Sequence, residues 1–149
     1  MRALSRRAAL ALGLGTAAAW AGAGCARATP SEAEAEIAKF TGGKPAELGR
    51  IAIDLPEIAE NGTAVPLSVT VESPMTATDR VTDVLVLADG NPNPRVAAFH
   101  FSPMSARAEV ATRIRLNATE NVIVVARTGE GRFYTARKEV KVTIGGCGG

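Results

Sequence analysis

A single cysteine framed by glycines near the C-terminal end is the residue best suited to covalent chemistry. The sequence closes with VTIGGCGG, in which Cys147 is the thiol. The frame around it consists of Gly145, Gly146, Gly148 and Gly149. Glycine has no Cβ and adopts a wide range of φ and ψ, so residues 145–149 are predicted to form a flexible arm. Fully extended, five residues reach about 17 Å, which gives the thiol access to another protein.

Nothing near Cys147 in the sequence activates its thiol. A free cysteine has a pKa of about 8.5, so only about a few per cent is thiolate near pH 7. No cation or helix N-terminus is adjacent, and the carboxylate of Gly149 disfavours the thiolate. We therefore expect activation to come from the active site that the arm enters, which favours a carrier over a catalyst.

Residues 1–28 have the pattern of a secretory signal peptide. A basic start that includes Arg6 and Arg7 precedes a run rich in Ala, Leu and Gly, and Ala26–Ala28 is a small-x-small cleavage pattern. Paired arginines before such a run are typical of a twin-arginine signal, which exports folded proteins to the periplasm. The run is a weak candidate for a stable membrane span. Acylation of Cys25 is the alternative to cleavage after Ala28, although the preceding GAG lacks the usual bulky aliphatic residue.

Removal of the signal changes both charge and cysteine content. Four arginines are lost, which leaves thirteen Lys and Arg against fifteen Asp and Glu, a net charge of about −2. This chain has no basic field that would indicate nucleic-acid binding. Cys147 becomes the only cysteine, and in an oxidising compartment this implies an intermolecular partner or a thiol kept for chemistry.

The chain from Arg50 onward has the two-residue period of β-strands. Apolar residues alternate with polar ones over 65–71, and Pro66 near the start suggests an edge strand. Residues 81–89 and 121–127 are nearly continuous apolar runs, as expected of central strands covered on both sides. Four more strands are expected at about 51–55, 96–101, 109–116 and 132–144. Seven strands separated by turn signals predict one immunoglobulin-like antiparallel β-sandwich over residues 29–144.

A short helix is expected before the strands, at about residues 31–40. Ser31 and Glu34 fit a capping box, and two glycines at 42–43 stop the run. The apolar faces of the two central strands exceed what one small core needs, so a buried interface with a partner is a plausible use for them.

Other chemistry is poorly supported. His100 is the only histidine and is expected on a sheet surface, so one His and one mature Cys cannot build a closed zinc site. No motif supports a Ser-His-Asp triad or a phosphate-binding loop. We expect no metal and no cofactor in this chain. Arg113 and Arg115 share one strand face, and more positive charge lies nearby in sequence at Arg127, Arg137, Lys138 and Lys141. Solvation explains these cations, with a weak anion-attracting surface near the C-terminal strand as the alternative.

The signal pattern, the strand pattern and the ending VTIGGCGG together resemble SoxY, the sulfur-carrier family of the bacterial thiosulfate-oxidation (Sox) system. The resemblance implies that Cys147 is the covalent attachment point for sulfur and that the four flanking glycines form a swinging arm. It also implies a heterodimer with SoxZ, a second β-sandwich that lacks its own signal and is exported with its partner.

The resemblance further implies a cycle of partner enzymes. The haem enzyme SoxAX couples thiosulfate oxidatively to Cys147, and the dimanganese hydrolase SoxB removes the terminal sulfone as sulfate. A molybdenum-haem sulfane dehydrogenase, where present, oxidises the remaining sulfur.

Two other functions are compatible with the residues. A thiol-disulfide redox protein would need a resolving cysteine, and a structural or adhesive sandwich would have an incidental tail.

Overall fold

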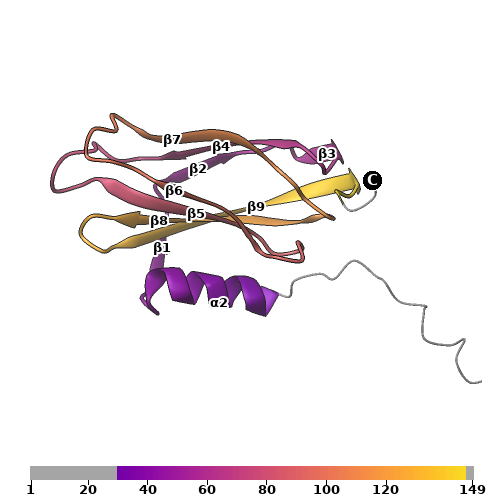
Figure 1. Ribbon diagram of the computed structural model, residues 1–149, viewed down its shortest axis with the longest axis horizontal. Coiled ribbons are helices and arrows are strands. Elements are labelled where there is room, and N and C mark those ends of the chain that lie inside the picture. The colour runs from indigo at the N-terminus through magenta and orange to yellow at the C-terminus, as the bar shows by residue number, and fades with distance from the viewer. Residues whose placement is uncertain (1–29, 147–149) are drawn as a thin grey trace, which may run out of the picture.

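The computed structural model describes residues 30–146, which form a two-sheet β-sandwich with one helix packed against it (Figure 1). The larger sheet has the order β1-β9-β8-β5-β6, with β3 also pairing with β9, and the smaller has the order β2-β4-β7. The elements are α2 (Pro30–Thr41), β1 (Ala46–Leu48), β2 (Ile51–Asp54), β3 (Ile58–Asn61), β4 (Val65–Val71), β5 (Val81–Ala88), β6 (Arg95–His100), β7 (Ala108–Ile114), β8 (Glu120–Thr128) and β9 (Phe133–Ile144). The expected signal peptide (1–28), Cys147, Gly148 and Gly149 lie outside the described residues.

The predicted sandwich is confirmed, with two strands more than the seven expected. β1 and β3 both pair with β9 in parallel, whereas the other pairings are antiparallel. β1 lies opposite the start of β9, at Phe133–Thr135, and β3 opposite its end, at Lys141–Ile144. β9 therefore serves as the shared strand that ties both short segments to the larger sheet.

The alternation predicted for residues 65–71 is confirmed in β4. Its apolar residues are buried between the two sheets, while Pro66 and Thr70 are exposed. The buried ones are Val65, Leu67, Val69 and Val71. The prediction of an edge position from Pro66 is wrong, because β4 is the central strand of the smaller sheet. β2 pairs with β4 only from Ser68 to Val71, so Pro66 lies beyond that pairing and its missing N–H costs no bond to β2.

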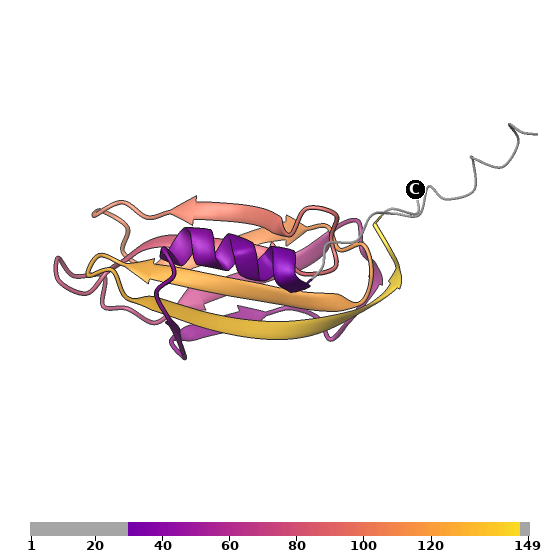
Figure 2. The same cartoon turned by 90° about the horizontal axis from the view of Figure 1, so that it is seen from below.

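The two apolar runs are central strands covered on both faces, as predicted. Val84, Val86, Val122 and Val124 face the sandwich core, whereas Leu85, Leu87, Ile123 and Val125 belong to a second cluster. Helix α2 covers that second cluster, and Figure 2 shows it lying over the larger sheet, roughly along its strands. Its Phe40 meets Phe133 edge to face, with ring centroids 6.0 Å apart. The far face of these strands is therefore occupied within the chain, which corrects the suggestion that it serves a partner.

The helix starts one residue earlier than expected. It begins at Pro30, so Ser31 lies in the first turn rather than at a cap, in keeping with the preference of proline for first-turn positions. Gly42 and Gly43 end the helix as predicted, with φ of 64° and 78°. The N–H of Gly43 donates to the Ala38 carbonyl at 3.0 Å, which satisfies one of the last free carbonyls of the helix.

Candidate functional site

The described chain leads directly to the base of the predicted arm. β9 is 12 residues long and ends at Ile144 beside β3 (Figure 1). Gly145 and Gly146 follow, and Gly146 immediately precedes Cys147 in the sequence. We call the segment Ile144–Gly146, together with the backbone that it contacts, the arm root.

Three backbone hydrogen bonds hold the arm root on the sandwich. The N–H of Gly62 donates to the carbonyl of Ile144 at 2.7 Å, and the N–H of Leu116 donates to the carbonyl of Gly62 at 2.8 Å. The N–H of Gly146 then donates to the carbonyl of Leu116 at 2.9 Å. Gly146 is buried, so the described part of the glycine frame is packed against the loops that precede β4 and follow β7.

Close approach explains why these positions are glycine. A methyl group at Gly145 would stand 2.0 Å from the carbonyl oxygen of Asn117, and one at Gly62 would stand 2.1 Å from the carbonyl oxygen of Leu116. Both distances are far below van der Waals contact, and both obstacles are backbone atoms. At Gly146 a methyl group would meet the side chain of Arg115, 2.6 Å from its Cγ. The absence of a Cβ at Gly145 and Gly146 therefore has a steric reason, which the sequence prediction of arm flexibility did not include.

A buried carboxylate holds the loop that receives the arm root. Glu120 Oε1 accepts hydrogen bonds from the N–H groups of Asn117 at 2.9 Å and Ala118 at 3.5 Å, and Oε2 accepts one from Gly90 at 2.7 Å. Asn91 adds a second connection, because its side-chain amide donates to the carbonyl of Arg115 at 2.8 Å. The side chains of Glu120 and Asn91 therefore hold the backbone of the loop after β7, and the arm root packs against that loop.

Burial raises the pKa of Glu120 above its ordinary value, and the nearby carboxylate of Asp89 adds to the rise. The backbone N–H donors of Gly90, Asn117 and Ala118 oppose this shift without cancelling it. Protonation of Glu120 is therefore easier in the folded protein than in the unfolded chain.

Arg115 is a cation at the arm root, where the sequence offered it only as part of a weak anion-attracting surface near the C-terminal strand. Its side chain is exposed, and its Cγ lies beside Gly146, which is 31 positions later in the chain. Its guanidinium makes no hydrogen bond or ion pair to any residue between 30 and 146. Arg113 lies on the same face but donates to the carbonyl of Ala64 at 3.5 Å. No local pattern in the sequence places Arg115 beside Gly146, because the two positions are brought together by the backbone hydrogen bonds of Gly62 and Leu116.

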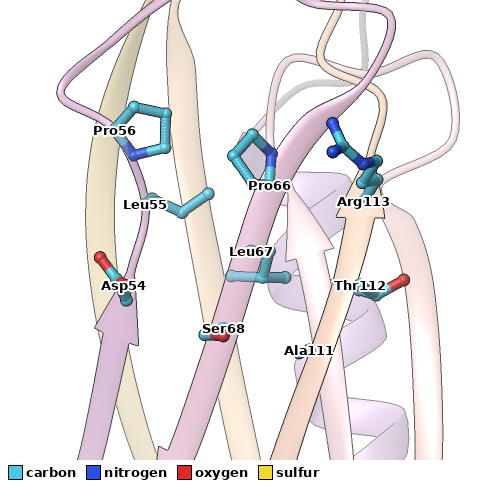
Figure 3. Close-up of a pocket in the computed structure, with 9 residues that line it drawn as sticks. All are labelled: Asp54, Leu55, Pro56, Pro66, Leu67, Ser68, Ala111, Thr112 and Arg113. Carbon is cyan, nitrogen blue, oxygen red and sulfur yellow. The ribbon is translucent and has the colours of Figure 1, made fainter.

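A shallow groove of about 640 Å³ lies between the end of β2, the start of β4 and β7 (Figure 3). Asp54 and Arg113 lie on opposite sides of it, and two prolines, Pro56 and Pro66, lie at one end. Its lining contains no thiol and no imidazole, so the groove itself offers no nucleophile comparable to a cysteine.

His100 lies on the sheet surface, as expected, within a charged cluster at the end of the larger sheet remote from the arm root. Its side chain is 77% exposed, and its Nδ1 lies 2.5 Å from Asp83 Oδ1. Arg127 Nε donates to Asp83 Oδ2 at 2.8 Å. Burial opposes ionisation of Asp83, but hydrogen bonds from Thr82, His100 and Arg127 outweigh it and lower the pKa of this carboxyl. The cluster therefore consists of an ion pair between Asp83 and Arg127 with His100 beside it, and it links β5, β6 and β8.

Among residues 30–146, no three His, Cys, Asp or Glu side chains converge as a metal site would require. No helix in that range is long and apolar enough to cross a membrane.

Comparisons with known proteins agree with the fold and identify the family. A family model described as sulfur oxidation protein SoxY matches residues 37–147. The structure of the sulfur carrier protein SoxY from Chlorobium limicola f thiosulfatophilum is 38% identical and covers 76% of this chain and 98% of that chain, with a TM-score of 0.65.

A superoxide reductase (neelaredoxin) from Ignicoccus hospitalis is also similar, with 22% identity, 76% of this chain and 92% of that chain covered, and a TM-score of 0.57. At that identity the likeness concerns the fold alone. The search of curated proteins gave no match. Because the family model and the 38% identical structure each span most of the chain, this protein belongs to the SoxY family of sulfur oxidation proteins, which are sulfur carriers rather than catalysts.

Proposed function

We propose that Cys147 is the covalent attachment point for sulfur intermediates of thiosulfate oxidation and that residues 145–149 present this cargo to partner enzymes. The observation that carries the proposal is the anchored arm root. The last described residue, Gly146, is bonded to the sandwich at the Leu116 carbonyl, and the only cysteine of the mature chain comes next in the sequence. Membership of a sulfur-carrier family supports assigning the cargo to that thiol.

The proposed chemistry begins with the thiolate of Cys147. Oxidative coupling joins its Sγ to the outer sulfur of thiosulfate, forms a cysteine S-thiosulfonate and transfers two electrons to the haem enzyme SoxAX. Hydrolysis by SoxB then adds water across the bond between the two sulfurs of the thiosulfonate group. It releases sulfate and two protons and leaves a persulfide anion on Cys147. A sulfane dehydrogenase oxidises that remaining sulfur where it is present.

In this proposal the chain positions the sulfur cargo, and the partner enzymes lower the activation barriers of its reactions. Gly148 and Gly149 leave the thiol unhindered inside a narrow active site. Gly145 and Gly146 allow the arm to swing when the hydrogen bond from Gly146 to Leu116 opens. Tethering keeps the cargo at a high local concentration near a docked partner. The protein itself holds no cofactor.

Export and assembly complete the proposal. Residues 1–28, with Arg6 and Arg7, would direct folded export by the twin-arginine route to the periplasm. The mature domain would travel with a SoxZ-like β-sandwich as a heterodimer, which explains why a folded-export signal is useful for a chain without a cofactor.

Intact-mass measurement tests the carrier role. The protein is incubated with thiosulfate and the coupling enzyme, and the wild type is expected to gain the mass of one thiosulfonate group. A Cys147→Ser variant should gain none, and a Cys25→Ser variant should load normally. A sulfur adduct on the Cys147→Ser variant would refute the assignment.

A further inference from the structure

One edge of the smaller sheet is the long and regular strand β7. The strand order is β2-β4-β7, so among residues 30–146 one side of β7 has no neighbouring strand. β7 pairs with β4 over Ala108–Ile114 without a register shift and contains no proline. The free edge of the larger sheet, β6, is less regular, because a bulge interrupts its pairing with β5 between Val86 and Leu87. Exposed edges are often blunted by prolines, bulges or inward-pointing charges, and β7 has none of these.

Two observations indicate which backbone groups of β7 face the free edge. In an antiparallel ladder, alternate residues direct both N–H and C=O to the same neighbour. Arg113 lies opposite Pro66 of β4, which has no N–H to donate, so the backbone of Arg113 is expected to face away from β4. Just beyond the strand, the N–H of Leu116 donates to the Gly62 carbonyl on the β4 side. Both observations assign the even-numbered residues to β4 and the odd-numbered residues of β7 to the free edge.

The exposed side chains of β7 carry charges that are complementary to their own reverse order. Glu109, Ala111 and Arg113 are all exposed, and Ala111 is the middle residue of the strand. When two copies of β7 pair antiparallel about a two-fold axis at Ala111, all of the strand overlaps. Glu109 of each copy then lies directly opposite Arg113 of the other copy, on the outer face of the sheet. Opposite charges at such positions stabilise an antiparallel pair.

The contacts that these two charges make within one chain are weak. An Arg107 guanidinium nitrogen lies 3.4 Å from Glu109 Oε1, with both side chains exposed, and Arg113 donates to the Ala64 carbonyl at 3.5 Å. Both distances are long for hydrogen bonds of charged groups. Moving the two-fold axis one residue earlier would place Arg107 opposite Arg113, two like charges, so the charges favour the axis at Ala111.

We propose that β7 is a dimerisation strand through which two copies of this chain join their smaller sheets into one continuous antiparallel sheet. The three opposed pairs of odd-numbered residues would exchange about six backbone hydrogen bonds. One like-charged pair, Arg107 opposite Arg115, lies beyond the ends of β7 and outside this ladder. Because the C-terminal end of β7 leads to the arm root, antiparallel pairing sets the two arm roots at opposite ends of the dimer.

Sedimentation analysis of charge-reversal variants tests the pairing. The protein is purified after export and studied in reducing buffer, which prevents disulfides between copies, and the wild type is expected to form a concentration-dependent dimer. Glu109→Arg and Arg113→Glu each place like charges at both opposed pairs, so each should raise the dissociation constant by at least about tenfold. Combining both substitutions restores opposite charges and should return the constant to within about threefold of wild type.

Arg137→Glu is the control, because Arg137 is exposed on β9 and does not belong to the smaller sheet. It should leave the dissociation constant unchanged, and melting temperatures verify that every variant is folded. A wild type that stays monomeric at about 1 mM, or a double variant that dimerises no better than the single ones, would overturn the proposal.

Amide hydrogen exchange identifies the strand that pairs. The amides of Glu109, Ala111 and Arg113 should exchange at least about tenfold more slowly when the protein concentration favours the dimer than when it favours the monomer. A dimer that forms without this protection would exclude β7 as its interface. Protection that appears only when a SoxZ-like protein is added would assign the edge to that partner and would likewise overturn self-pairing.

Discussion

The carbonyl oxygen of Asn117 occupies the space that a side chain at Gly145 would need. A methyl group there would stand 2.0 Å from that oxygen, and the next residue, Gly146, donates its N–H to Leu116. The first glycine of the GGCGG frame is therefore part of a close backbone contact. This relationship separates two roles of glycine, because close packing is required at the arm root and conformational freedom is proposed beyond it.

Gly145→Ala is expected to detach the arm root from the loop. The obstacle is backbone and cannot rotate away, so the chain after Ile144 must shift and the hydrogen bond from residue 146 to Leu116 must weaken. Amide hydrogen exchange at residue 146 should accelerate by about tenfold, equivalent to about 1.4 kcal/mol in the opening free energy. Gly146→Ala is the comparison, because it meets the flexible side chain of Arg115 and should accelerate exchange less. Equal exchange rates in the wild type and Gly145→Ala would contradict the steric account.

Gly62→Ala should destabilise the whole domain. Gly62 is buried and links Ile144 to Leu116 through two backbone hydrogen bonds, and a methyl group would stand 2.1 Å from the Leu116 carbonyl oxygen. We expect a loss of about 2 kcal/mol in the free energy of unfolding. For a domain of this size the melting temperature should then fall by roughly 8 °C. Gly129→Ala serves as control, since its nearest neighbour would be 3.7 Å away, and it should change stability little.

Glu120 should give the protein a distinctive pH dependence. Its folded-state pKa is raised, mainly by burial, so the folded protein binds a proton here more tightly than the unfolded chain. Its contribution to stability is greatest below the ordinary glutamate pKa and is lost as pH rises through the raised value. Urea unfolding of wild type and Glu120→Gln should show a stability difference that moves in favour of wild type as pH falls from 7.5 to about 4.5. A difference that stays constant over this range would argue against the shift.

Asp83 should behave in the opposite way. Its pKa is lowered because hydrogen bonds from Thr82, His100 and Arg127 outweigh the cost of burial. The resulting stability is present above the ordinary aspartate pKa and is lost as pH falls through the lowered value. Asp83→Asn is expected to cost about 1–2 kcal/mol near pH 7, and this cost should shrink in acid. Denaturant titrations at pH 7 and pH 3 provide the measurement, and a cost that grew in acid would contradict the assignment.

Phe40→Ala tests whether α2 belongs to the folding core. Phe40 packs edge to face on Phe133 and covers the second apolar cluster. Its truncation should cost about 2–3 kcal/mol in the isolated protein. Leu48→Ala is the control because Leu48 is 86% exposed, and it should change stability by less than about 0.5 kcal/mol. Wild-type stability in Phe40→Ala would mean that α2 adds little to the fold.

Local patterns in the sequence were sufficient for most of the fold. Alternation over 65–71 identified the buried face of β4, and uninterrupted apolar runs identified β5 and β8 as central strands. The glycines at 42–43 ended the helix where expected. These features depend on a residue's near neighbours, which is why periodicity and turn chemistry reveal them.

Features that depend on distant segments were not predictable in this way. β1 and β3 have three and four residues, are largely exposed, and exist because β9 offers an edge to each. The second apolar face of β5 and β8 is covered by α2 and not by a partner. Periodicity shows that a face is apolar, but it does not show which element packs on it. Arg115 reaches the arm root only because β7 ends beside β9's last residues, a relationship between positions 31 apart.

The length of β9 has a mechanical consequence for the proposed arm. β8 pairs with it from Phe133 to Val140, and β3 continues the pairing to Ile144, so the strand is bonded along its whole length. Ladder hydrogen bonds run roughly across the strands. When a partner pulls on the arm along the axis of β9, the force acts as shear on all the hydrogen bonds that pair β9 with its neighbours. These bonds then share the force and do not open one at a time. The sandwich can thus resist traction while the tip is drawn into an active site.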